Sequence, residues 1–244
     1  MDSSAGMGFG TGLTPLLFLV GYDPLQVVPI LLISEAITGL TSGLFHHEFN
    51  NVEFSFKRPF TNETKIMGGI AFFGCVAIAL SIVITYFAVQ LSKDAIKSYV
   101  GILVLVMGFI GLVKIKQGTT RYRPKLLVFF GALAGFNKGI GAGGYGPVVM
   151  MGQIFSGIYE KTAAAITSLA EGIVCVVGVL TFFTLSSQGV SIDYLLLPSV
   201  FSGGFFAAII SPYLVRVIPN KTWKVVIPIY AIGIGIFTLC KIYF

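Results

Sequence analysis

Residues 137–147 read Asn-Lys-Gly-Ile-Gly-Ala-Gly-Gly-Tyr-Gly-Pro, and this glycine-rich break decides the fold. It interrupts an apolar segment, residues 126–154, and precedes an apolar run, residues 163–185, whose one charged side chain is Glu171. A related pattern lies near the start of the chain, where residues 10–15 read Gly-Thr-Gly-Leu-Thr-Pro and Glu35 is the one charge of the next apolar run. The rest of the chain repeats or frames these segments.

Matched landmarks indicate that the chain is internally duplicated. The spacing between the two glutamates equals that between Gly21 and Gly157, and the spacing between Pro15 and Pro147 is four residues shorter. One four-residue insertion in the second copy therefore aligns all three pairs, which predicts an internal duplication. We divide the single membrane domain, residues 1–244, into repeat 1 (1–113), a basic linker (114–125) and repeat 2 (126–244).

The composition predicts an integral membrane protein. Hydrophobic residues make up 55% of the chain, charged residues 11%, and the mean hydropathy is +0.91. A soluble surface needs about a quarter charged residues. The apolar runs are long enough to cross the roughly 30 Å hydrocarbon core as helices and lack the strict alternation of barrel strands. We therefore expect an all-α, multi-pass protein of the plasma (inner) membrane, with the lipid bilayer as its surroundings.

The apolar runs predict three transmembrane helices in each half, in addition to the glycine-broken segment. In repeat 1 they are residues 25–45, 66–89 and 99–113, and in repeat 2 they are residues 163–185, 195–215 and 225–240.

The distribution of basic residues predicts the topology. The linker carries five cations within twelve positions, which is typical of a cytoplasmic loop under the positive-inside rule, although a lipid-headgroup or nucleic-acid patch would have a similar composition. If residues 126–154 span the membrane, nine Lys and Arg lie on the linker's side and six on the other; if they turn back, the division is twelve to three. The rule therefore favours a re-entrant segment.

The length of the broken segment agrees with this interpretation. Residues 126–136 would rise about 16 Å as a helix, half of a bilayer core. By the same reasoning the first broken segment enters from the opposite side. The chain then consists of two inverted four-segment repeats, which is an architecture of transporters.

The two breaks are candidate anion sites. Glycines let successive amides face one point. A proline near the start of a half-helix removes no helical hydrogen bond, because the first N–H groups of a helix have no acceptor within it. The amino ends of the half-helices would therefore direct partial positive charge at the midplane. Lys138 is the one cation inside the break, where a charge requires a partner or water; the other reading is that it snorkels or forms a structural salt bridge. The candidate substrate-binding residues are Gly10, Thr11, Gly12, Thr14, Asn137, Lys138, Gly141, Gly143, Gly144 and Tyr145.

Two acids lie at equivalent depths in the matched helices. Glu35 and Glu171 each lie near the middle of an apolar run, so each carboxyl is expected to be protonated or paired. One interpretation is proton coupling or gating, and the other is a hydrogen bond to a neighbouring helix.

Residues 139–147, followed by Gly157 and residues 164–172, resemble the TauE/SafE family of sulfite and organosulfonate exporters. The similarity covers nearly the whole chain. It implies a prokaryotic plasma-membrane transporter of sulfite, thiosulfate-like or small sulfonated anions. The first copy departs from the pattern, because it lacks an apolar arm before Gly6 and has no counterpart of Lys138.

Other classes of protein are weighed against this one. An enzyme is not expected, because neither a catalytic Ser-His-acid set nor histidine spacing for a metal is present, and no cofactor or nucleic acid is implied. The adjacent pair His46-His47 does not face one point on a helix, and the three cysteines lie in apolar runs. A passive anion channel remains the alternative function. For the assembly, a homo-oligomer remains an alternative to a monomer.

The topology makes a prediction for cysteine labelling in intact cells. We expect the linker to be cytoplasmic and the turn at residues 156–161 to lie on the same side, so Gly118→Cys and Glu160→Cys should both be protected from an external impermeant reagent. Labelling of Glu160→Cys with protection of Gly118→Cys would show that the broken segment spans the membrane.

Overall fold

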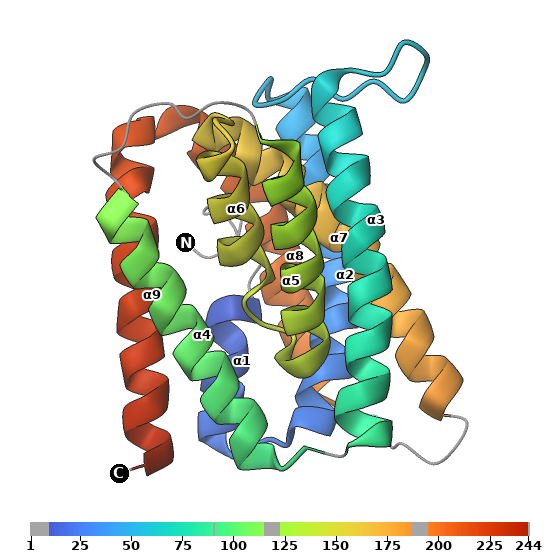
Figure 1. Ribbon diagram of the computed structural model, residues 1–244, viewed down its shortest axis with the longest axis vertical. Coiled ribbons are helices and arrows are strands. Elements are labelled where there is room, and N and C mark those ends of the chain that lie inside the picture. The colour runs from blue at the N-terminus through green and yellow to red at the C-terminus, as the bar shows by residue number, and fades with distance from the viewer. Residues whose placement is uncertain (1–9, 90, 115–122, 187–194, 244) are drawn as a thin grey trace.

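The computed structural model describes residues 10–89, 91–114, 123–186 and 195–243, and the regular structure in these ranges is helical (Figure 1). The elements are α1 (Gly10–Val20), α2 (Pro24–Glu48), α3 (Asn62–Ile82), the π-helical turn η2 (Val83–Ala88), α4 (Lys93–Lys114), α5 (Pro124–Gly141), α6 (Tyr145–Phe155), α7 (Glu160–Ser186), α8 (Leu196–Val217) and α9 (Asn220–Tyr243). The prediction of an all-α protein is confirmed.

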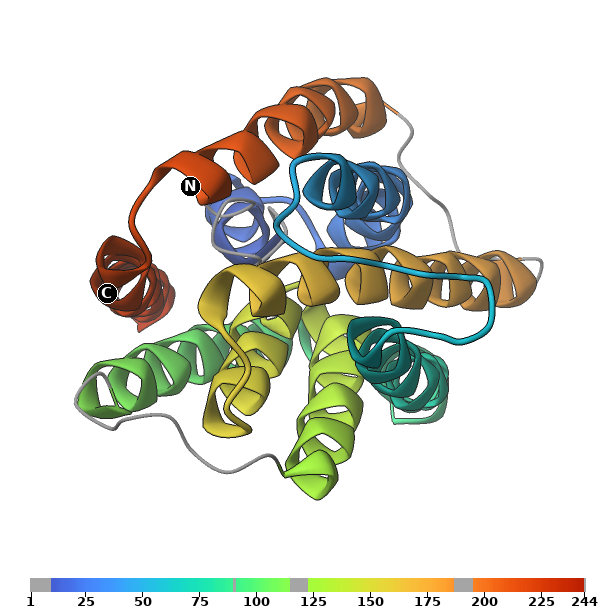
Figure 2. The same ribbon diagram turned by 90° about the horizontal axis from the view of Figure 1, so that it is seen from above.

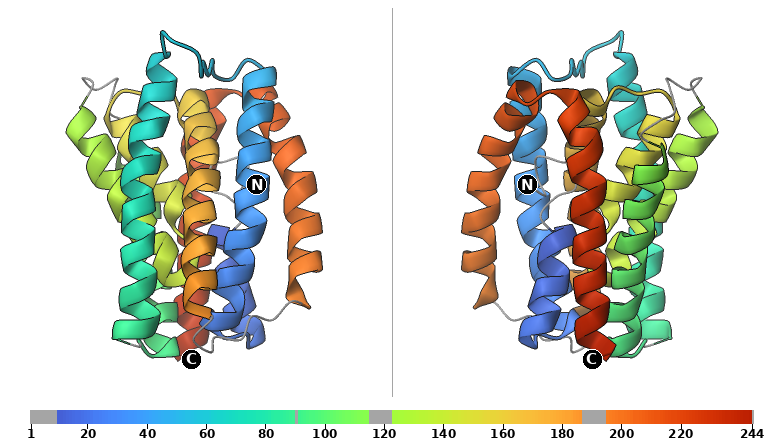
Figure 3. Two further views of the ribbon diagram at one scale, coloured as in Figure 1. Left: turned by 90° about the vertical axis from the view of Figure 1, so that its right-hand side faces the viewer. Right: turned by 90° about the vertical axis from the view of Figure 1, so that its left-hand side faces the viewer.

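Within the described ranges, five helical segments are long and apolar enough to cross a membrane. They are Pro24–Glu48, Asn62–Ala88, Lys93–Val113, Glu160–Leu185 and Leu196–Val217, and α9 adds a shorter apolar stretch, Pro228–Cys240. The long helices run side by side in one bundle (Figure 3). The chain is therefore a multi-pass membrane protein.

Local sequence explains where two of the long helices begin. At α2, the Gln26 side chain accepts a hydrogen bond from the Asp23 backbone N–H at 3.0 Å, a capping box, and Pro24 occupies the first helical position. At α3, the Thr61 hydroxyl accepts a hydrogen bond from Thr64 N at 3.3 Å. Both caps satisfy amides that the helix itself leaves free.

The broken segment of the second half is a re-entrant hairpin. We call the end of the molecule at which α4 ends and α5 and α7 begin the linker end, and the opposite end the far end (Figure 1). Helix α5 runs inward from the linker end, and α6 returns to the same end. Between them the chain turns at Ala142 and Gly144, whose φ angles are +57° and +79°, and glycine adopts a positive φ without strain. The re-entrant shape agrees with the cation count.

Helix α1 is a half-helix of opposite direction. It begins in the interior and runs outward to the far end, whereas α6 begins at a similar depth and runs to the linker end (Figures 1 and 3). Residues 1–9, where an inner arm of the first copy would lie, are outside the described residues, as are linker positions 115–122. The full inverted repeat, and the division of the domain into two repeats, therefore remain predictions.

Helix α7 is the centre of the bundle. Viewed from above, it separates α2 on one side from α3 and α5 on the other (Figure 2). Its contact with α2 is close because two glycines meet, and a Cβ added at Gly39 would lie 2.9 Å from Gly172 Cα. This contact sets Glu35 of α2 and Glu171 of α7 at neighbouring positions.

Candidate functional site

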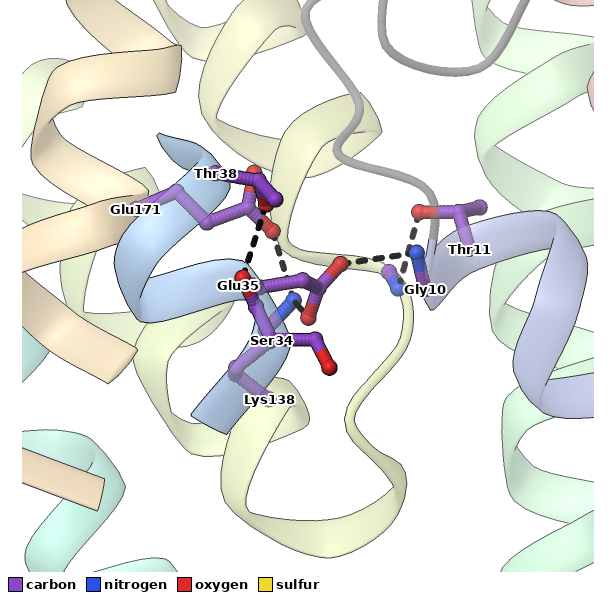
Figure 4. A network of polar contacts seen from close by, with 8 residues as sticks. Gly10, Thr11, Ser34, Glu35, Thr38, Lys138 and Glu171 are labelled. Carbon is purple, nitrogen blue, oxygen red and sulfur yellow. Dashed lines mark hydrogen bonds and ion pairs between the residues drawn. The ribbon is translucent and has the colours of Figure 1, made fainter. Parts of the chain in front are cut away.

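The centre of the molecule holds a buried ion triad. Lys138 Nζ donates to Glu171 Oε1 at 2.6 Å and also to Glu35 Oε2 (Figure 4). The lysine side chain is 1% exposed and each carboxylate side chain is 2% exposed. The structure therefore supplies the partners that a buried lysine requires, since Lys138 is bonded to both matched acids at once, and its role toward an anion remains a prediction.

The amino end of α1 donates a further hydrogen bond to the triad. Gly10 N donates to Glu35 Oε1 at 2.7 Å, so both oxygens of this carboxylate accept hydrogen bonds from buried groups. The first amides of a helix have no partner within the helix and carry partial positive charge, which suits an anionic acceptor. Glycine fits position 10 because an added Cβ would lie 2.7 Å from the backbone oxygen of Ala142, which cannot move aside as a side chain can.

The two glycine-rich breaks meet at this point. Gly144 N, at the amino end of α6, donates to Thr11 Oγ1 of α1 at 3.3 Å. A Cβ added at Gly143 would lie 3.2 Å from Gly10 O, so the two backbones pass close to each other. Two half-helix amino ends, one from each half of the chain, therefore converge beside the triad (Figure 4).

Residues that flank the triad in the chain, or that belong to α1 and α6, carry buried polar atoms with no hydrogen-bond partner in the protein. They are Asn137 Nδ2, Tyr145 Oη, Thr14 Oγ1 and Ser34 Oγ. Each of the four residues is fully buried. A buried polar atom without a partner costs about 1–3 kcal/mol, so each of these atoms favours a bound water or a polar ligand.

Two candidate residues remain to be placed, Gly12 and Gly141. Gly12 is buried in the first turn of α1, and a side chain at Gly141 would press on Val100 of α4. The structure thus gathers the acids and the converging breaks, and it gives Gly141 a role in helix packing.

Three hydroxyl residues that hold the break in place were missed at the sequence level. Tyr99 Oη of α4 donates to Asn137 Oδ1, and Tyr86 Oη of η2 donates to Ile140 O. Ser81 Oγ of α3 donates to Phe136 O at 2.6 Å. These bonds satisfy carbonyls near the interior end of α5. The available signal was a hydroxyl residue within an otherwise apolar run.

The described residues contain no group of three His, Cys, Asp or Glu side chains that could hold a metal ion. His46 and His47 bond separately: His46 Nδ1 lies 3.1 Å from Asn51 Nδ2, and His47 Nδ1 accepts from Phe54 N at 3.2 Å. The chemistry available at the centre is that of amide, hydroxyl, ammonium and carboxylate groups.

A re-entrant hairpin and an opposed half-helix that meet at buried charges define a multi-pass membrane transporter. The comparison with known families agrees: residues 1–238 match the family described as Sulfite exporter TauE/SafE, and the chain belongs to this family. It is also similar to the probable membrane transporter protein YtnM of Bacillus subtilis (strain 168), with 26% identity over 231 residues, which cover 88% of this chain and 70% of the relative. The resemblance inferred from the sequence is confirmed.

The triad predicts a strong effect of Lys138→Met on folding. Removing one partner of a buried ion pair leaves an uncompensated charge and typically costs about 3–5 kcal/mol. We expect a clear loss of thermal stability in detergent, and partial recovery when Glu35→Gln and Glu171→Gln are added.

Lys93→Met is the matched control. Lys93 Nζ lies 2.5 Å from Asp23 Oδ2, but the two side chains are 63% and 41% exposed, and exposed pairs contribute about 0–1 kcal/mol. Equal stability of the Lys138→Met and Lys93→Met proteins would contradict the structural importance of the triad.

Proposed function

We propose that this chain transports small sulfur-containing anions of the sulfite, thiosulfate or sulfonate class, that it binds them where the two glycine-rich breaks meet, and that transport is coupled to protons. The observation that carries the proposal is a buried lysine held between two carboxylates beside unpartnered donors. The substrate class follows from the family, and the preference for an anion follows from the groups at the site.

The charge of the triad argues for coupling to protons. When both carboxylates are ionised the three groups sum to one negative charge, which repels an anion. Protonation of one carboxyl makes the triad neutral, and protonation of both leaves the lysine charge uncompensated. Because like charges repel strongly at low dielectric, anion affinity is expected to rise with each bound proton.

The unpartnered donors argue for an oxyanion. Asn137 Nδ2 and Tyr145 Oη can each donate to an anionic oxygen, and a lysine released from a carboxylate supplies further donors. The amino ends of α1 and α6 add the favourable field of helix termini. A sulfur centre with several oxygens offers acceptors in several directions, which matches donors that come from different helices.

The opposed half-helices argue for a carrier. Helix α1 leads from the centre to the far end and α6 leads to the linker end, so movement of either one would open the site toward one side. A passive anion channel is the alternative. It would share the donors, and flux through it would follow the anion gradient alone.

Binding is the first test of the proposed function. Purified protein should be stabilised against heat by the preferred anion among sulfite, thiosulfate, sulfate, taurine and sulfoacetate, by about 2.7 kcal/mol at a hundredfold excess over Kd. Tyr145→Phe removes one donor to a charged ligand and should weaken binding by about 10- to 100-fold. Tyr213→Phe, at an exposed position of α8, is the control. Equal affinity of the two variants would remove Tyr145 from the site.

Coupling is the second test, in proteoliposomes with an imposed pH gradient. Glu171→Gln and Glu35→Gln each mimic a protonated acid, so each variant should bind the anion at neutral pH at least as well as the wild type and lose proton-driven accumulation. Wild-type affinity should fall as pH rises, because the deprotonated triad repels the anion. The exposed Glu48→Gln is the control. Gradient dependence that persists in both glutamine variants would reduce the two acids to structural groups.

A further inference from the structure

Helix α2 carries a buried polar stripe that leads away from the triad. Ser34, Thr38, Ser42 and His46 follow one another at intervals of four residues, so they lie along one face of the helix. Their residue exposures are 0%, 4%, 4% and 0%. The stripe begins next to Glu35 and rises about 18 Å toward the linker end, where α2 terminates.

The stripe contains polar atoms that nothing in the protein satisfies. Ser34 Oγ, Ser42 Oγ and His46 Nε2 have no hydrogen-bond partner, and neither has Ser211 Oγ of α8, the helix that packs on this part of the bundle. Thr38 Oγ1 donates to Ser34 O at 2.9 Å (Figure 4). Isolated polar groups are expensive to bury, and a run of them indicates a hydrated path.

The stripe ends next to a polar cavity at the linker end. Asn51 Nδ2 lies 3.1 Å from His46 Nδ1 and donates to Pro212 O at 2.9 Å. Asn51 also lines a cavity of about 510 Å³, together with His47, Asn50, Val52, Glu53, Glu63 and Thr162. The Asn51 side chain therefore links the imidazole to this cavity.

The lining of the cavity contains groups that can exchange protons with water. Its titratable lining residues are His47, Glu53 and Glu63. The neighbouring helix ends carry Glu160, Lys161 and Arg216, and Lys161 Nζ donates to Arg216 O at 2.8 Å.

We propose that the stripe is the proton path between the linker end and the triad, with His46 as the relay at its outer end. A proton from cavity water binds His46 Nδ1 when the Asn51 amide, whose Nδ2 lies 3.1 Å away, moves aside. The imidazolium then gives its Nε2 proton to water beside Ser42, and the excess proton passes along the hydroxyls to a carboxylate oxygen of Glu35 or Glu171. The carboxyl that receives it releases Lys138 Nζ for the anion, and rotation of the neutral imidazole ring restores the starting tautomer. This inference rests on the proton coupling of the proposed function.

Hydration of the stripe can be tested without transport. In protein whose Cys75, Cys175 and Cys240 are replaced by alanine, Ser42→Cys should react with a small water-soluble methanethiosulfonate at least ten times faster than Thr238→Cys. Thr238 of α9 is only 1% exposed, and its hydroxyl donates to Ile234 O within the same helix. Equal reaction rates at the two positions would overturn the hydrated path.

The proton role is tested in proteoliposomes. His46→Gln and Ser42→Ala should leave anion affinity within about threefold of the wild type, measured by thermal shift, while gradient-driven accumulation falls at least tenfold. Thr41→Val is the matched control, because its hydroxyl lies off the stripe and donates to Ile37 O. Unchanged accumulation in both stripe variants would overturn the proton path alone. Wild-type protein that binds the anion and ignores the pH gradient would instead contradict the proposed coupling.

Discussion

The structure depends on the pairing of three charges at a depth where none of them could stay alone. Lys138 comes from α5, Glu35 from α2 and Glu171 from α7, so the triad joins the re-entrant hairpin to two membrane-spanning helices. An unpaired charge at the bilayer centre is unfavourable by at least about 2.5–3.5 kcal/mol. The inward reach of α5 and the close contact of α2 with α7 at Gly39 and Gly172 both serve this pairing.

The backbone at the break is subject to the same constraint. A helix that ends inside the membrane leaves amides and carbonyls without partners, and these must be satisfied within the protein. Near the interior end of α5, Ser81 and Tyr86 bond to carbonyls; at the start of α1, the Gly10 amide bonds to Glu35. The half-helices are therefore held by side chains from neighbouring helices, and these side chains fix the geometry of the site.

Much of the fold could be predicted from the sequence, because helix length and cation distribution are properties of single segments. The apolar runs, the re-entrant hairpin and the shared depth of the two acids follow from them. The bonds of Lys138 to both acids, and that of Tyr99 to Asn137, could not be predicted, because they depend on how each helix is rotated about its axis. Helices that are apolar on most faces give little information about that rotation. The stripe on α2 is visible in the sequence only once its buried face is known.

The energetics of the triad disfavour uncoupled binding, in which the anion of the proposed function binds without a proton. Lys138 pairs with both carboxylates, so an anion that takes its ammonium group leaves a buried carboxylate without its counter-charge unless that carboxyl gains a proton. Leaving one charge of a buried pair uncompensated costs about 3–5 kcal/mol. An energy of that size corresponds to an occupancy about 100- to 4,000-fold lower for an anion bound without its proton. The proposed coupling would therefore require no dedicated gate between proton and anion, because the shared lysine would make each ligand a condition for the other.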